Sequence, residues 1–172
     1  MSQADWRTLP PPGKPSPHTK AKCSNDPDAA GLTLTDAERS ARVVVCAYVD
    51  AWGTLSLPVG FTYDQKYPLD HLRYWFSGSR LTQIRATASL EAFAALIGDF
   101  TRRYGAPMKL VRDSIPSEIG PLPRVSETWS TPQGSIDLID PTLPSDEIAL
   151  RFTARGPVSP AGAAHSLKGA SR

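Results

Sequence analysis

Between Ser89 and Pro107 the chain reads SLEAFAALIGDFTRRYGAP, and this stretch predicts one amphipathic helix. Its aromatic and aliphatic residues recur at the spacing of a single helical face, formed by Phe93, Ile97, Phe100 and Tyr104. Ser89 suits the position that caps the start of a helix, whereas Gly105 and Pro107 are typical of its end. We therefore expect a helix over residues 89–104 whose apolar face packs on a sheet.

Alternating apolar residues on either side of this helix predict strands. One β-hairpin is expected over residues 72–88 and a second over residues 125–138, each with a Gly-containing turn. Edge strands are expected near residues 55–59 and over residues 147–153. This order predicts an α+β fold with a mostly antiparallel sheet of four to six strands, made of two hairpins and edge strands, packed on the central helix.

A second, N-terminal helix is predicted from a capping box. Thr35 is followed three residues later by Glu38, a spacing typical of a helix start. The next residues, ARVVVCAYVDAW at 41–52, are ambiguous, because their β-branched side chains favour a strand whereas the cap favours a helix. We favour a helix from Asp36 to about Val49.

The ends of the chain differ in composition from its centre. The 172 residues include 17 prolines, and six of these lie within the first thirty residues. We therefore expect residues 1–31 to form a disordered Pro-rich arm, residues 32–155 a single domain, and residues 156–172 a disordered tail. Deletion of residues 1–22 and 157–172 is accordingly expected to leave the unfolding transition nearly unchanged.

Charge and hydropathy exclude some partners. The net charge is only +2, and the sequence has no dense basic stripe, so we expect no nucleic-acid partner. The longest apolar run, at residues 43–49, is too short for a transmembrane segment.

The compartment follows less directly from the sequence. Residues 1–22 lack the apolar region of a signal peptide, which predicts a cytoplasmic protein by default. The cell envelope or periplasm is the alternative if the chain is processed or starts elsewhere. Cys23 and Cys46 are the only cysteines, and either a disulfide or two free thiols fits their spacing.

Motifs for catalysis are absent from the sequence. It has no phosphate-binding glycine loop and no nucleophile elbow, and His71 is the single histidine of the central domain, so no metal or other cofactor is expected. The carboxylates of Asp137, Asp140 and Glu147 fit ordinary edge and turn positions. The enzyme alternative is a small hydrolase-like protein that uses His71 with Asp70 and a tyrosine.

An aromatic and basic cluster on the first hairpin predicts a binding site. Because side chains alternate along a strand, Trp75 and Arg73 should lie opposite Tyr74 and Phe76. An exposed Trp75 beside Arg73 and Arg85 would suit contact with a partner protein, a ring-bearing ligand or a sugar. The competing interpretation places Trp75 beneath the N-terminal segment or the helix that starts at Asp36.

The resulting prediction is a small non-catalytic binding or interaction module that contacts an unknown protein, with the cell envelope as one setting. A hairpin, a helix that ends in Tyr104-Gly105-Ala106-Pro107 and a later hairpin with Trp129 occur in this order. This order is similar to that of small bacterial proteins, many of which are exported. The resemblance implies no catalytic residue.

Overall fold

The computed structural model describes residues 1–13, 15–29, 31–52, 55–63, 66–118, 120–142 and 147–156. In chain order the elements are α1 (Gln3–Thr8), β1 (Thr19–Cys23), α2 (Asp36–Ser40), β2 (Val43–Trp52), β3 (Leu55–Pro58), β4 (Phe61–Tyr63), β5 (Tyr67–Ser77), β6 (Arg80–Ser89), a 3₁₀ turn (Leu90–Ala92), α3 (Phe93–Tyr104), β7 (Lys109–Ile115), β8 (Leu122–Thr131), β9 (Gly134–Thr142) and β10 (Glu147–Ala154). The ten strands form one sheet in the order β1-β2-β5-β6-β10-β9-β8-β7, with β3 paired to β2 and β4 paired to β5. All of these pairings are antiparallel.

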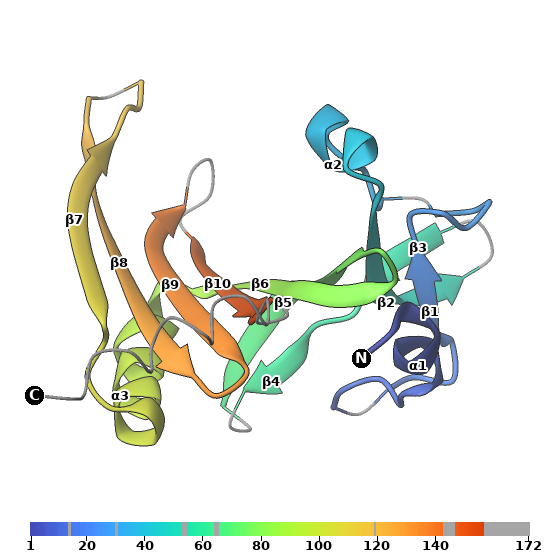
Figure 1. Cartoon of the computed structure of the whole chain (residues 1–172), viewed down its shortest axis with the longest axis horizontal. Coiled ribbons are helices and arrows are strands. Elements are labelled where there is room, and N and C mark those ends of the chain that lie inside the picture. Colours follow the sequence, from blue (N-terminus) through green and yellow to red (C-terminus); the bar gives the residue numbers. More distant parts are fainter. Residues whose placement is uncertain are drawn as a thin grey trace, which may run out of the picture.

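The prediction of a few strands on a central helix is wrong. The ten-stranded sheet is the framework of the molecule, and α3 packs near one end of it, against β8 and β9 (Figure 1). The predicted hairpins are present, but residues 19–23, 43–52 and 109–115 contribute further strands that the expected architecture lacked.

The predicted helix from Asp36 to Val49 is also wrong, because α2 ends at Ser40 and β2 begins at Val43. The capping box itself is present, since the Thr35 side chain accepts a hydrogen bond from the Glu38 backbone. One face of β2 packs Cys46 and Tyr48 against Trp6. The other face contributes to a separate cluster, which comprises Leu32, Val45, Ala47, Val49 and Trp75. A strand buried on both faces is a continuous apolar run, and it lacks the alternation that reveals a half-exposed strand.

The first 31 residues contain ordered elements, although the sequence predicted a disordered arm there. Trp6 of α1 is 1% exposed, and its ring centroid lies 4.8 Å from that of Tyr48 and 5.0 Å from that of Tyr74. A disulfide joins Cys23 of β1 to Cys46 of β2, so the two cysteines are paired. The predicted tail lies outside the described residues from position 157 onward.

The helix predicted at 89–104 is present as a 3₁₀ turn followed by α3 from Phe93 to Tyr104, and its buried face is rotated from the expected one. Leu96 is 0% exposed and Phe100 is 5% exposed, whereas Tyr104 is 40% exposed. Phe93 and Ile97 are half-buried at the margin of the same cluster. The strands contribute its centre, where Trp129, Leu138 and Ile148 are fully buried.

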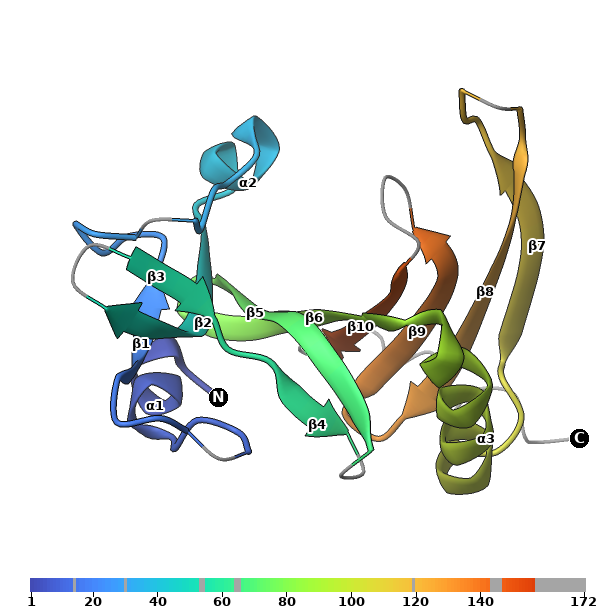
Figure 2. The same ribbon diagram turned by 180° about the vertical axis from the view of Figure 1, so that it is seen from behind.

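The sheet is strongly curved, and its two sides differ. Helices α1 and α3 lie on one side of it, whereas α2 lies on the other side, over β2 (Figures 1 and 2). The long β7–β8 hairpin rises at the end of the sheet opposite α2 (Figure 2). Between these two elements, no described helix covers β6, β10 and β9 on the α2 side. No helix among the described residues has the length and apolar character needed to cross a membrane.

Candidate binding face

The side of the sheet that faces away from α3 carries polar side chains, and we call it the open face. Its middle is one row of residues that are paired strand to strand from β5 to β7. The row comprises Arg73, Arg85, Arg151, Asp137, Thr128 and Lys109. In β5, β6, β10, β9 and β8 a residue next to the row member belongs to the α3 core, so those five side chains point away from it, and Lys109 extends the row on β7.

Three arginines stand side by side in this row. Arg73 is paired with Arg85 across β5 and β6, and Arg85 is paired with Arg151 across β6 and β10. Like charges directly opposite each other destabilise a sheet. None of the ion pairs found among the described residues includes any of the three.

Arg85 is held in place by its neighbours. Its guanidinium carbon lies 4.3 Å from the centre of the Trp75 ring, and its Nε donates to Gln83 Oε1 at 2.5 Å. Burial, and next the positive charge of Arg151, lower the pKa of Arg85, while Glu38 acts in the opposite direction. The Arg85 guanidinium is therefore partly shielded from water and close to a second positive charge, that of Arg151.

The Trp75 ring packs against the Arg85 guanidinium, and little of its surface is accessible to solvent. The indole is 8% exposed, and its Nε1 donates to Glu38 Oε1 of α2 at 2.8 Å. It packs in a cluster separate from the one that contains Phe76, as the alternation along the strand predicts. Of the two interpretations of Trp75, burial beside the helix that starts at Asp36 describes its position.

Arg73 and Arg151 flank Arg85, and both are half-buried. Arg73 Nη2 donates to the Gly31 carbonyl at 3.4 Å, which directs this side chain toward the segment before α2. Arg151 Nε is buried and has no hydrogen-bond partner. Asp137 is paired with Arg151 across β9 and β10, yet its carboxylate accepts from Thr128 Oγ1 at 2.8 Å and makes no ion pair with the arginine.

The sequence identified Arg73 and Arg85 but missed Arg151 and the rest of the row. Arg73 and Arg85 lie on one hairpin, so local alternation is enough to place them together. Arg151 joins them only because β10 pairs with β6, a contact between distant parts of the chain. Its position between the apolar residues Leu150 and Phe152 was the available signal.

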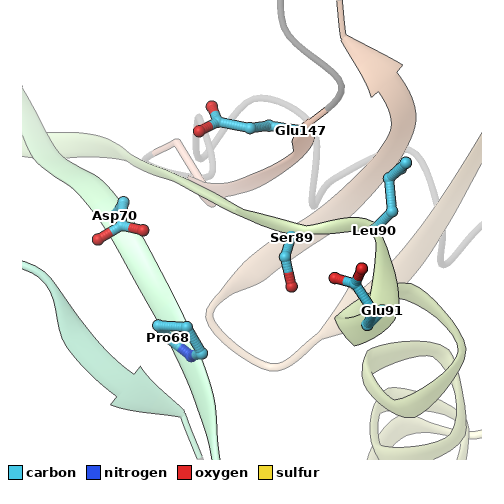
Figure 3. A pocket seen from close by; sticks show the side chains of 6 residues that line it. All are labelled: Pro68, Asp70, Ser89, Leu90, Glu91 and Glu147. Carbon is cyan, nitrogen blue, oxygen red and sulfur yellow. The ribbon is translucent and has the colours of Figure 1, made fainter.

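A hollow of about 350 Å³ lies on the same face, further along β6 than Arg85. It is lined by Pro68, Asp70, Ser89, Leu90, Glu91 and Glu147. Figure 3 shows that its carboxylates come from separate elements: Asp70 from β5, Glu147 from β10 and Glu91 from the turn before α3. Within the described part of the chain, no group of three or more potential ligands is placed to hold a metal ion.

The described residues show no catalytic arrangement around His71. His71 is exposed at an irregularity of β5 with a φ angle of 51°, and no hydrogen bond among the described residues links it to Asp70 or to a tyrosine. Ser16, His18 and Asp50 also lie together, but the serine hydroxyl donates to Asp50 at 2.8 Å while the His18 ring stacks on Trp52. In a hydrolase triad the serine donates to the imidazole instead.

A second polar cluster surrounds Asp99 of α3, which is 6% exposed. Arg102 and the Tyr63 hydroxyl donate to its carboxylate, and Arg103 Nε lies 2.9 Å from Oδ2. Burial alone would raise the pKa of Asp99, but the hydrogen bonds from Arg102 and Arg103 outweigh it and lower the pKa. Both oxygens are engaged, so the carboxylate fastens β4 to α3 and is not available for a ligand.

Replacing Asp99 with asparagine is expected to lower the free energy of unfolding by about 1–3 kcal/mol at neutral pH, because charged hydrogen bonds are lost from a buried site. Since the pKa of Asp99 is lowered in the folded state, its contribution is complete above about pH 5. The contribution disappears as the pH falls through the folded-state pKa, below 3.8. Denaturant midpoints measured from pH 2 to 7 should therefore converge for wild type and variant at the acid end.

The matched control for this prediction is Asp113→Asn. Asp113 pairs with Arg124 on the surface, where their side chains are 39% and 36% exposed. Exposed ion pairs contribute little to stability, so this variant should change the midpoint by less than Asp99→Asn does. Equal losses in the two variants would contradict the structural role of Asp99.

Comparison of this chain with protein-family models, with curated proteins and with solved structures gives no match. The function is therefore inferred from the geometry of the open face.

Proposed function

We propose that this protein is a non-catalytic binding module whose open face binds an acidic segment of a partner protein. The observation that carries the proposal is the cross-strand set of Arg73, Arg85 and Arg151, which has no ion-pair partner among the described residues. In the unbound protein the neighbouring positive charges destabilise the sheet, and an anionic partner would relieve that repulsion.

Charge complementarity favours a short acidic segment over nucleic acid. The three arginines are bordered by carboxylates on both sides, with Glu38 beside Trp75 and Asp137 on β9. Duplex DNA needs an extended basic stripe to neutralise its evenly spaced phosphates. A local basic patch with acidic borders suits one or two carboxylates, and its borders would repel a long polyanion.

The disulfide supports a location in an oxidising compartment. Cys23 and Cys46 are both 0% exposed and joined across β1 and β2. Disulfides persist in secreted and envelope proteins and are rare in the cytosol. We therefore place the binding module in the cell envelope or outside the cell.

The test of this function measures the binding of a fluorescently labelled oligoglutamate peptide by anisotropy at low salt. The double variant Arg73→Gln, Arg85→Gln should bind the peptide at least about tenfold more weakly than wild type, because two charged contacts are lost. A labelled oligolysine peptide should not bind to wild type.

The control removes the same amount of charge elsewhere. Arg80 and Arg112 are exposed on β6 and β7 and lie outside the arginine set, so Arg80→Gln, Arg112→Gln should change the affinity less than about twofold. Equal loss of binding in both double variants, or no binding of oligoglutamate to wild type, would overturn the proposed function.

A further inference from the structure

Arg85 and Arg151 lie at the centre of the open face, where Arg85 is exposed and Arg151 is half-buried. They are directly paired across β6 and β10, in the middle of the strand order, and they lie on the side of the sheet that no described helix covers there. Lys109, at the other end of the row, is exposed on the terminal strand β7.

The Arg85 guanidinium is positioned before any ligand arrives. The Trp75 ring lies 4.3 Å from its guanidinium carbon, and the hydrogen bond from Nε to Gln83 restrains it from a second direction. The Trp75 ring is itself held by Glu38. The two terminal nitrogens of Arg85 make no hydrogen bond to the described residues, and a planar guanidinium fork presents such nitrogens to an oxyanion in bidentate fashion.

Arg151 contributes a second hydrogen-bond donor, and its Nε has no acceptor among the described residues. Its Nε is buried and without a partner, although most buried polar atoms in proteins are hydrogen-bonded. The nearest candidate in the strand register, Asp137, is bound to Thr128 instead. An anion that reached the terminal nitrogens of both guanidinium groups would give Arg151 an acceptor there and neutralise the repulsion between the two charges.

We propose that Arg85 and Arg151 together form a subsite for a single oxyanion, a carboxylate or phosphate group held between the two guanidinium groups. This inference rests on the proposed function, because an acidic partner segment would place one of its carboxylates there. Arg73, turned toward Gly31, borders the subsite, and Trp75 and Gln83 act as positioning residues for Arg85.

The test uses small anions in place of a peptide. The full-length protein is titrated with sodium phosphate or sodium acetate against sodium chloride at constant ionic strength. Binding is followed by the NMR signals of the arginine Nε–H groups and by the thermal midpoint. We expect saturable shifts of the Arg85 and Arg151 signals and a midpoint that rises with anion concentration, since a ligand stabilises the state that binds it.

Two substitutions of Arg151 separate charge from geometry. Arg151→Gln should weaken anion binding at least about tenfold, and its midpoint in chloride should not fall, because a repulsive charge is removed. Arg151→Lys keeps the charge but loses the fork, so it should bind more weakly than wild type and more tightly than Arg151→Gln. The control Arg112→Gln should bind the anion as wild type does.

The results distinguish the subsite from the binding module. Saturable binding that depends on Arg151 supports the subsite, and the tighter of the two anions identifies carboxylate or phosphate as its ligand. The subsite is overturned if neither anion binds saturably, or if Arg112→Gln weakens binding as much as Arg151→Gln. If oligoglutamate binds but neither small anion does, the subsite is contradicted and the binding module is supported. If a small anion binds saturably but oligoglutamate does not, the binding module is contradicted and the subsite is supported.

Discussion

Replacing Trp6 with alanine is expected to lower the free energy of unfolding by about 3–5 kcal/mol, as large-to-small substitutions of buried aromatic residues do. Trp6 is 1% exposed and lies against the rings of Tyr48, Tyr74 and Phe76. The indole thus fills the space between α1 and the sheet, which the remaining side chains cannot fill when it is removed. Equilibrium denaturation in urea measures the loss.

Trp52→Ala is the matched control, since Trp52 is 54% exposed at the end of β2. Its substitution should cost less than about 1 kcal/mol, because little buried surface is lost. Deletion of residues 1–22 should also lower the free energy of unfolding, contrary to the expectation from the sequence, because it would remove α1 and most of β1. Equal effects of Trp6→Ala and Trp52→Ala on the free energy of unfolding would contradict the packing of α1 on the sheet.

Removal of the disulfide is expected to lower the free energy of unfolding by about 3 kcal/mol, because the bond restricts the conformations of the unfolded chain. The two cysteines are 23 positions apart in sequence, and both are fully buried. The double variant Cys23→Ala, Cys46→Ala should show this loss when its denaturation is compared with that of the oxidised wild type.

Reductant provides the internal control for this measurement. Wild type that is unfolded and refolded in dithiothreitol should lose most of the same stability, whereas the double alanine variant should not respond to dithiothreitol. Two free thiols in wild type that has been refolded under air would contradict the pairing of Cys23 with Cys46.

Local patterns predicted those elements of the fold whose signals lie within one short stretch. The hairpin over 72–88, the strand at 147–153 and the helix that ends before Gly105 were all visible as alternation or helical spacing. The segment at 43–52 was misassigned because helix α1 and the α2 region bury its two faces. Its partners α1 and β1 lie in the Pro-rich segment, whose composition concealed one large buried residue, Trp6.

The candidate site shows the same limit. Arg73, Trp75 and Arg85 could be grouped from the sequence because they share one hairpin, but the sequence could not say that α2 covers Trp75 with Glu38. Arg151 depends on strand pairing between distant segments, which alternation does not encode. Pairing of this kind is set by the packing of the whole sheet.

The place of β10 in the strand order determines when the molecule can become complete during synthesis. Among the described residues this strand follows all the others, yet it lies between β6 and β9 and joins the two parts of the sheet. Until it leaves the ribosome, the edges of β6 and β9 have no neighbour, and exposed edges of this kind pair readily with other chains. The arginine set is likewise incomplete until that moment, because Arg151 lies on β10.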